Sequence, residues 1–247
     1  MEKREKFSYK TWISPSYTDG KGRLSISGLV NFLQDESIYE LEHEPELKAY
    51  FDQYGIRMLL ASRQIDVYAW PKYLDEVTIS TWVFDINPSY GYRNTMIYDR
   101  EGHVLVATAA LGIFVGIDKM NIVRIPEEVK TSVTTFPPFE MPLLPRRLRV
   151  SRSLPPSIRP DVTVLASMLD FNKHLNNAQY LGIASNFIPL DFEYKRVRIE
   201  FKHAARLGDV LHPYVYATER GWIVDLREND HMSYAIVYFV KSLEENE

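Results

Sequence analysis

The segment Asp170-Phe171-Asn172-Lys173-His174-Leu175-Asn176-Asn177-Ala178-Gln179-Tyr180 decides the fold. Its first eight residues are mostly polar, and an apolar helical pattern begins at its end. Asn176 or Asn177 is suited to cap that helix, because an Asn side chain accepts hydrogen bonds from the amides of the first turn. Small and apolar side chains follow at helical spacing, namely Ala178, Leu181, Ala184, Ser185 and Ile188. The pattern predicts a helix over 176–188 that packs closely on a sheet.

Three polar side chains alternate just before this helix. Asp170, Asn172 and His174 stand on an approach that we expect to be extended. The helix N-terminus that follows carries free amides and a partial positive charge. A carboxylate, an amide and an imidazole beside it can activate a water molecule and stabilise a developing oxyanion. The alternative is that they only form a turn and a cap, but Asn-Asn followed by Tyr180 exceeds what capping requires.

The segment resembles the active-site string of the acyl-acyl-carrier-protein thioesterases. Other short strings in the first half stand in the order of that family, namely Thr81-Trp82-Val83, Tyr98-Asp99-Arg100-Glu101-Gly102 and Arg124-Ile125-Pro126-Glu127-Glu128-Val129. The resemblance covers most of the chain. It implies an α+β fold of two tandem hotdog domains, each with a long helix packed against an antiparallel β-sheet.

The resemblance also implies an activity, which is hydrolysis of the thioester of fatty acyl-acyl-carrier protein. The products would be a free fatty acid and the carrier thiol, so that chain elongation ends. The implied catalytic residues are Asp170, Asn172 and His174, and the implied substrate contacts include Asn176, Asn177 and Tyr180. His174 is the best candidate general base, since the ordinary pKa of histidine lies near neutral pH. Asn172 can orient the carbonyl or the water, and Asp170 can orient His174 or act on water itself. No cofactor and no metal is implied.

One departure from the family keeps alternatives open. When Ile199–His203 is aligned with the family pattern, Ala204 and Ala205 stand where plant members have Glu and Cys. A chain without that Glu could be a non-catalytic acyl-thioester binding protein. A hydrolase that acts on acyl-CoA is a further alternative. A hotdog hydratase or dehydratase is disfavoured, because Asn-x-His-x-Asn-Asn looks like the thioesterase version of the string.

The order of strand, turn, helix and strands occurs twice along the chain, which indicates a duplicated unit. Asp19–Leu24 can be laid on Asp170–Leu175, and Leu74–Val77 on Leu207–Val210. Strands are expected at Phe7–Ser16 and Val162–Leu169, before the two turns. The predicted domains are 1–134 and 161–247, joined by a linker over 135–160 that is rich in proline and arginine.

The two copies differ at the residues that matter for chemistry. Lys21 and Arg23 of the first copy stand where the second has Asn172 and His174, so the second copy is expected to carry the reaction. The first copy keeps the helix without the chemistry and is expected to hold the acyl tail. The residues expected near that tail are Ile26, Leu29, Val30 and Leu33, for which ordinary core packing is the alternative.

Composition narrows the setting. The net charge of −4 argues against nucleic acid as a partner, and the absence of cysteine excludes disulfides and thiolate chemistry. The first residues are charged, and the most apolar stretch, Val104–Ile117, is too short to span a bilayer. We therefore expect a cytoplasmic monomer or homodimer that does not bind membranes. Its expected partner is an acyl carrier protein, for which the linker's Arg146, Arg147, Arg149, Arg152 and Arg159 form a candidate docking patch.

Overall fold

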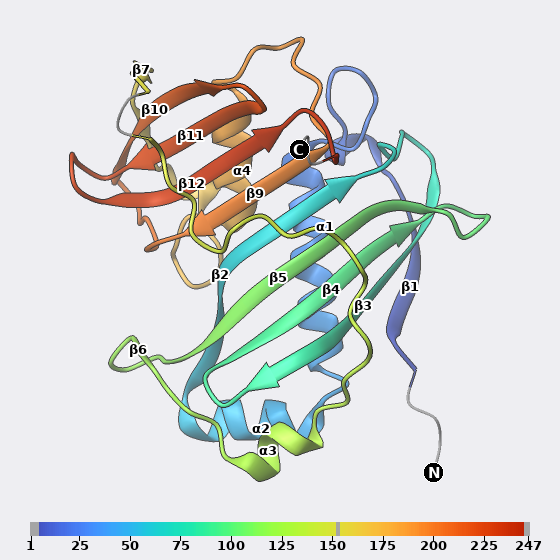
Figure 1. Cartoon of the computed structure of the whole chain (residues 1–247). Helices are drawn as coiled ribbons and strands as arrows, with labels where there is room; N and C mark the ends of the chain where they lie inside the picture. The colour runs from blue at the N-terminus through green and yellow to red at the C-terminus, as the bar shows by residue number, and fades with distance from the viewer. Residues whose placement is uncertain (1–4, 152–153, 245–247) are drawn as a thin grey trace. The chain divides into compact units, whose positions relative to one another are not determined.

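The computed structural model describes residues 5–151 and 154–244, and the chain forms two compact units. The first comprises the chain up to Leu24, Asn31–Arg63 and Val67–Pro142, and the second comprises Ser25–Val30, Gln64–Asp66 and the chain from Leu143 onward. In each unit a helix lies against an antiparallel sheet (Figure 1).

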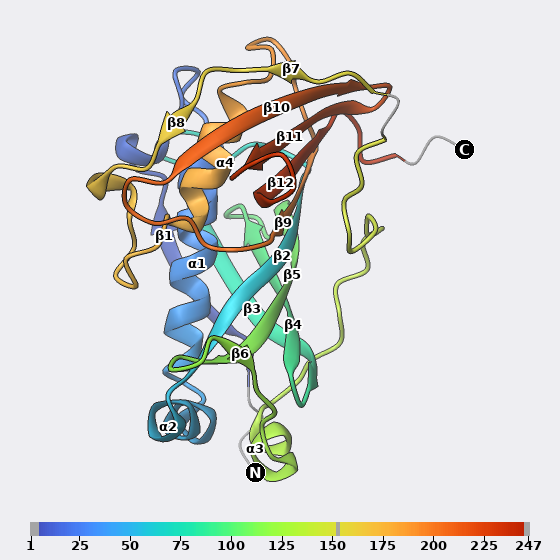
Figure 2. The same cartoon turned by 90° about the vertical axis from the view of Figure 1, so that its left-hand side faces the viewer.

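The first half of the chain supplies most elements of the first unit. In chain order they are β1 (Phe7–Trp12), the 3₁₀ turn η1 (Pro15–Tyr17), α1 (Ile26–Leu41), α2 (Pro45–Tyr54), β2 (Ile56–Val67), β3 (Glu76–Asn87), β4 (Tyr90–Tyr98), β5 (Val104–Gly116), β6 (Asn121–Ile122) and α3 (Glu127–Ser132). The strand order is β1-β3-β4-β5-β2, and β6 pairs with β5. Figure 2 shows α1 on one face of this sheet and the segment after α3 on the other.

The second half repeats this plan with shorter elements. They are β7 (Ser157–Ile158), β8 (Val162–Thr163), the 3₁₀ turn η2 (Ala166–Met168), α4 (Asn177–Ser185), β9 (Arg196–Phe201), β10 (Val210–Thr218), β11 (Gly221–Arg227) and β12 (Ser233–Val240). The strand order is β9-β12-β11-β10-β7, and β8 also pairs with β10. Helix α4 packs on β11 and β12.

The helices begin and end where local chemistry sets their limits. Ser25 precedes α1 and accepts a hydrogen bond from the Gly28 amide through Oγ at 3.0 Å, which satisfies one amide of the first turn. Helix α2 starts at a proline and ends at Gly55, whose φ of 59° is the left-handed conformation that glycine adopts without strain. Residues 26–54 therefore form two helices rather than one.

Three expected segments are shorter in the structure. The strand predicted at Phe7–Ser16 ends at Trp12, and η1 then begins at Pro15, which has no amide to donate to a ladder. The strand predicted at Val162–Leu169 was wrong beyond Thr163, because η2 follows with its closing bond from the Leu169 amide to the Ala166 carbonyl. The helix predicted over 176–188 ends at Ser185, close to a proline that disfavours helical backbone in the residue before it.

The segment after α3 covers the face of each sheet that lies away from the helix. In the first unit Phe136, Phe139 and Met141 pack against Trp82, Met96 and Ala107. The Trp82 indole donates to the Pro137 carbonyl, and the Phe139 amide donates to the Asn94 side chain. In the second unit the apolar residues of this segment, Leu148, Val150 and Leu154, pack against Tyr216, Ile223 and Ile236. The proline-rich segment is thus part of both cores.

A buried ion pair lies inside the second unit. Arg196 on β9 donates to both carboxylate oxygens of Asp66 at 2.7 Å, and both side chains are almost fully buried. Gln64 donates to the same carboxylate at 3.1 Å and also accepts the Leu144 amide. Asp66 lies on β2, so a residue from the first half of the sequence completes the core of the second unit.

Candidate active site

The Asp170–His174 segment forms a tight turn, so the expectation of an extended approach was wrong. The Asp170 Oδ1 atom accepts hydrogen bonds from the amides of Asn172 at 2.9 Å and His174 at 3.0 Å. The Asp170 amide in turn donates to the His174 carbonyl at 2.8 Å, and Lys173 adopts a φ of 62°. An Asp side chain that binds amides two and four residues ahead favours a turn over a strand. The turn brings Asp170, Asn172 and His174 into one loop.

The helix begins directly after this turn. Asn176 is its N-cap, and its Oδ1 atom accepts the Ala178 amide at 2.8 Å. Asn177 is the first helical residue and is half-buried. The inward face of α4 carries Ala178, Leu181 and Ala184, all fully buried, so small side chains let the helix lie close to its sheet. The partial positive charge of the α4 N-terminus is therefore held next to the turn.

The side chains of the three candidate catalytic residues differ in exposure. Asn172 is exposed, whereas Asp170 and His174 are half-buried. The backbone of His174 is fixed on two sides, because it bonds to Asp170 and also pairs with Arg206 in a short antiparallel bridge. The neighbouring Phe171 is 81% exposed. The backbone of His174 is therefore held by hydrogen bonds, and its side chain keeps part of its surface in contact with solvent.

Tyr180, which was expected to contact substrate, lies one turn inside the helix and is almost fully buried. Its hydroxyl accepts a hydrogen bond from the Ala205 amide at 2.8 Å. Burial raises the pKa of Tyr180 to about 12, opposed by the Ala205 hydrogen bond and assisted by the negative charges of Asp209 and Asp170. Tyr180 therefore ties α4 to the segment that follows β9, and its hydroxyl stays protonated.

Two further polar residues at this end of the unit were missed by sequence reasoning. Asp209 accepts the Arg206 amide at 2.8 Å and also bonds to the buried hydroxyl of Tyr234, whose pKa is raised by burial and by the Asp209 charge. Asp209 and Asp170 both act on Tyr180. The repeat could have identified Asp209, because its counterpart in the first unit is Asp75.

The first unit contains the same turn with different side chains. Asp19 Oδ1 accepts the amides of Lys21 at 2.9 Å and Arg23 at 3.0 Å, and the Asp19 amide donates to the Arg23 carbonyl at 2.7 Å. Gly22 has a φ of 69°, which matches Lys173. The alignment of Asp19–Leu24 with Asp170–Leu175 is confirmed by this geometry. Arg23 lies over the Trp70 ring with its guanidinium carbon 5.7 Å from the ring centre.

The second alignment between the copies was wrong by one residue. The Lys72 amide donates to the Asp75 carboxylate at 2.7 Å, and the Arg206 amide donates to Asp209 in the same way. Asp75 therefore corresponds to Asp209, and Leu74, with a φ of 66°, corresponds to Gly208. Aligning Leu74 with Leu207 gives identical leucines, but the hydrogen bonds show that the equivalent residues are offset by one. Sequence similarity alone therefore gave the wrong register. In the corrected register Ala204 corresponds to Trp70.

Models of two domains match this chain. The acyl-ACP thioesterase N-terminal domain matches residues 4–133, and the acyl-ACP thioesterase C-terminal domain matches residues 155–237. This chain belongs to the acyl-ACP thioesterase family.

Individual relatives agree with this assignment at low identity. An acyl-[acyl-carrier-protein] hydrolase of Cuphea viscosissima is 24% identical over 226 residues, which are 84% of this chain and 53% of that protein. A palmitoyl-acyl carrier protein thioesterase of Arabidopsis thaliana is 23% identical over 84% of this chain and 53% of that protein. The chain thus spans about half the length of the curated relatives it matches.

Solved structures match this family member over nearly its whole length. An acyl-ACP thioesterase from Bacteroides thetaiotaomicron matches with a TM-score of 0.84 and 17% identity, over 95% of this chain and 97% of that one. The 12:0-ACP thioesterase from Umbellularia californica matches with a TM-score of 0.83 and 14% identity, over 95% and 96%. The predicted α+β fold of two tandem hotdog domains is confirmed by these matches. The boundaries at 134 and 160 stay a prediction.

The residues expected near the acyl tail of this thioesterase family member are buried. Ile26, Leu29, Val30 and Leu33 all lie on the inward face of α1. Burial is compatible both with contact to a tail and with ordinary core packing, so their role stays a prediction. None of the helices in residues 5–151 and 154–244 is long and apolar enough to cross a membrane.

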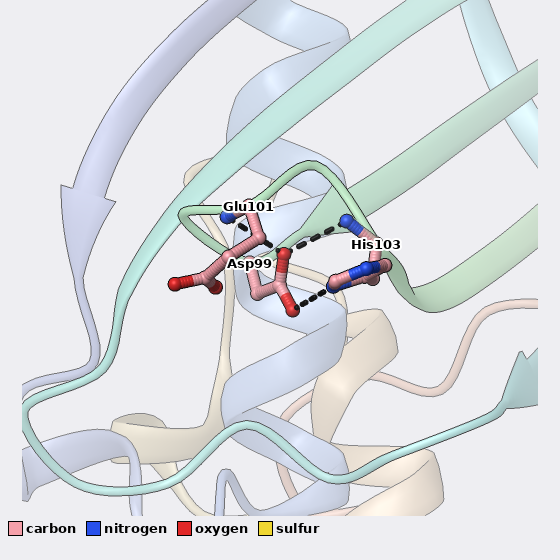
Figure 3. Close-up of side chains that lie close together, drawn as sticks. All are labelled: Asp99, Glu101 and His103. Atoms are coloured by element: carbon pink, nitrogen blue, oxygen red, sulfur yellow. Dashed lines mark hydrogen bonds and ion pairs between the residues drawn. The ribbon is translucent and has the colours of Figure 1, made fainter.

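One group of possible metal ligands lies in the β4–β5 hairpin (Figure 3), namely Asp99, Glu101 and His103. Asp99 accepts the amides of Glu101 at 3.0 Å and His103 at 2.8 Å, and it also contacts the His103 ring at 3.0 Å. These are the bonds of an Asx turn. The group is explained as a hairpin closure and carries no metal assignment.

Proposed function

We propose that this chain hydrolyses the thioester of fatty acyl-acyl-carrier protein and releases a free fatty acid and the carrier thiol. The observation that carries the proposal is the turn of the second unit. It presents Asp170, Asn172 and His174 at the N-terminus of α4, in a chain matched by both domain models of the family. The first unit has the same turn without the imidazole.

The reaction requires three tasks of these residues. His174 accepts a proton from water as the water attacks the thioester carbonyl, since an imidazole changes charge near neutral pH. The Asn172 amide group and the positive end of α4 stabilise the oxyanion of the tetrahedral intermediate. The intermediate collapses with loss of the thiolate, which takes the proton from His174. Asp170 holds the turn that sets the position of His174, and its alternative role as the base stays open.

The carrier protein is part of the proposal. Arg146, Arg147, Arg149 and Arg159 are exposed in the described part of the second unit, whereas Arg152 lies outside the described residues. Attraction between this patch and an acidic carrier would mainly raise the rate constant for association. Double charge reversal at Arg147 and Arg149 should raise KM for acyl-carrier substrates and leave KM for short acyl-pantetheine substrates unchanged. A cytoplasmic location stays a proposal, and the plant relatives named above are described as chloroplastic.

The decisive experiment is thiol release from a panel of acyl-carrier and acyl-CoA thioesters. Turnover that is fastest with acyl-carrier thioesters supports the proposal. Turnover only with acyl-CoA would favour the acyl-CoA hydrolase. Tight binding without turnover across the panel would favour the non-catalytic binding protein, for which Ala204 in place of the family Glu is the motivating observation.

Asn172→Ala separates an oxyanion donor from a surface residue. If Asn172 donates to the oxyanion, the substitution should lower kcat by about 10² to 10³. If Asn172 is an exposed turn residue with no contact to substrate, kcat should hardly change. Asn172→Asp controls for the shape of the side chain, because it keeps the size and removes the donor.

A further inference from the structure

The interior of the first unit is polar at its centre. Helix α1 directs Leu33, Glu36 and Glu40 toward the sheet at helical spacing, and the two glutamates are buried, Glu36 with 0% exposure. Glu40 forms an ion pair with Arg93 on β4 at 2.8 Å. Arg63 on β2 is also buried. Two acidic and two basic side chains therefore occupy a layer that is usually apolar.

The sheet below these charges has a row of threonines. In the register of the sheet, Thr81 on β3 is paired with Thr95 on β4, and Thr95 is paired with Thr108 on β5. Partners that are directly opposite share a face of the sheet. Arg93 lies on the same face, because it stands two residues before Thr95 and bonds to Thr81 at 3.4 Å. All three threonines are buried.

The second unit shows that the fold does not need this polarity. Its counterparts to the threonine row are Val215, Val224 and Val237, which are paired in the same register on β10, β11 and β12. All three valines are buried. Valine and threonine have the same shape, so one copy fills the row with methyl groups and the other with hydroxyls. Arg93 corresponds to Trp222 by the same register. Arg63 corresponds to Val197, because Tyr68 at the end of β2 and Lys202 after β9 make matching backbone bonds to Leu105 and Tyr234.

Several of the polar atoms have no hydrogen-bond partner within the described residues. They are both carboxylate oxygens of Glu36, Nε and Nη1 of Arg63, and Oγ1 of Thr108. Burying such groups without partners costs about 1 to 3 kcal/mol each. Burial raises the pKa of Glu36 to about 8, with Arg93 opposing the rise and Glu40 adding to it. At neutral pH the Glu36 carboxyl can therefore both donate and accept a hydrogen bond.

We propose that the helix–sheet layer of the first unit binds an acyl chain that carries a hydroxyl group away from its carbonyl carbon. The hydroxyls of Thr81 and Thr95 already bond to one another, so the ligand hydroxyl would bond to the Glu36 carboxyl and to Oγ1 of Thr108, both of which lack partners within the described residues. The apolar part of the chain would lie along the inward face of α1, where Leu33 precedes Glu36 by one turn. A plain alkyl chain cannot satisfy these groups, and a site built for a hydroxyl rejects the analogue that lacks it. The choice of an acyl chain rests on the proposed function, whereas the requirement for a polar ligand group does not.

The test uses binding, so that it does not depend on catalysis. The probes are pantetheine amides of dodecanoic acid and of a set of hydroxydodecanoic acids that differ in the hydroxyl position. An amide replaces the thioester and resists hydrolysis, and no free carboxylate is present to pair with Arg63. Isothermal titration calorimetry should show at least one hydroxylated probe that binds about tenfold tighter than the plain probe, which corresponds to about 1.4 kcal/mol.

Two variants locate the effect. Glu36→Met and Thr108→Val should each remove most of the tenfold preference. Thr108→Val is expected to fold, because Val237 fills the equivalent place in the second unit. The matched control is Val237→Thr, which should leave the preference unchanged.

Equal or tighter binding of the plain probe, absence of binding by every probe, or a preference that survives Thr108→Val and Glu36→Met would each overturn the proposal. The polar groups of Glu36, Arg63 and Thr108 would then form hydrogen bonds with water and not with a ligand. If the preference holds while no thioester is hydrolysed, the proposed function fails and the polar binding site stands.

Discussion

The two units share a backbone plan but differ in where they carry polar side chains, either at the helix N-terminus or at the centre of the sheet. At the helix N-terminus the second half of the sequence has His174, Tyr180 and Tyr234, where the first half has Arg23, Leu29 and Leu105. At the centre of the sheet the first unit has the threonine row with Glu36 and Arg93, where the second has valines.

The residues that fix the backbone are the ones that both units keep. Asp19 and Asp170 close the helix-entry turn, and Asp75 and Asp209 close the turn before β3 and β10. An Asp that binds several amides is costly to replace, because those amides lose their partner. Side chains that point into the helix–sheet layer carry no such constraint and could diverge. In this chain, polar residues that both units share stabilise the backbone, whereas polar residues found in one unit only are the candidates for function.

Removal of the His174 imidazole should have the strongest consequence for activity. His174→Ala should lower kcat by about 10² to 10⁴, the usual span for a general acid or base. Arg23→Ala, its counterpart, should leave kcat within about twofold, because the first unit is expected to carry no chemistry. Steady-state kinetics on an acyl-carrier thioester checks both variants. Equal losses would mean that the active unit has been assigned wrongly.

The second effect concerns pH and the centre of the first unit. The pKa of Glu36 is about 8 in the folded chain against 4.5 for an ordinary Glu. The folded state therefore binds more protons than the unfolded state between these values, and stability falls as pH rises through about 8. The loss should be on the order of 4 kcal/mol between pH 5 and pH 8.5.

Thermal unfolding measured at several pH values checks this expectation. The groups that act on Glu36 are Arg93 and Glu40, and Tyr9 on β1 faces it as well. Burial lowers the pKa of the nearby Arg63 only to about 9, so it stays charged over most of the range. Glu36→Gln should remove this part of the pH dependence. A variant with the same slope as the unaltered chain would contradict the assignment to Glu36.

Exchanging a threonine of the first unit with the equivalent valine of the second should change the free energy of unfolding by a smaller amount. Thr108→Val should raise the free energy of unfolding by about 1 kcal/mol, because it removes a buried hydroxyl that has no partner in the described structure. Val237→Thr should lower it by about 1 to 3 kcal/mol for the opposite reason. Denaturant unfolding of both variants checks the pair. Two changes of the same sign would show that the rows differ for a reason other than polarity.

The two helix-entry turns also differ at their left-handed residue, where a modest change in stability is expected. Gly22 and Lys173 occupy equivalent left-handed positions, with φ of 69° and 62°. A residue with a Cβ atom is strained there by about 1 kcal/mol, and glycine is not. Lys173→Gly should therefore stabilise the second unit by about 1 kcal/mol, and Gly22→Lys should destabilise the first by a similar amount. The midpoint of thermal unfolding reports both, and opposite shifts are the expected result.

The sequence was sufficient for features that repeat or that depend on local chemistry. The helix that begins after Asn176 could be predicted from its cap and from the spacing of its apolar residues. The two matching turns could be aligned because Asp19 and Asp170 stand at the same distance from a helix start. The turn geometry itself was not predicted, since alternation of Asp170, Asn172 and His174 also suits a strand.

Features that depend on pairing across the chain could not be predicted. The equivalence of Asp75 and Asp209 is evident only from their hydrogen bonds to the amides of Lys72 and Arg206, which the amino-acid sequence does not reveal. The row of Thr81, Thr95 and Thr108 exists only once the strand register is known. Glu36 and Glu40 belong to an acidic run, which in sequence looks like a solvated helix face. Their burial became evident only from the structure.

The ion pair between Asp66 and Arg196 limits how this chain could be divided or recombined. A cut in the proline-rich segment would leave the second half with Arg196 fully buried and without its carboxylate. Breaking a buried pair by removing one partner costs about 3 to 5 kcal/mol, a large part of the stability of a small domain. The second half is therefore not a free-standing module for fusion or exchange between relatives. A recombinant half would need β2 supplied in trans, or an apolar residue in place of Arg196.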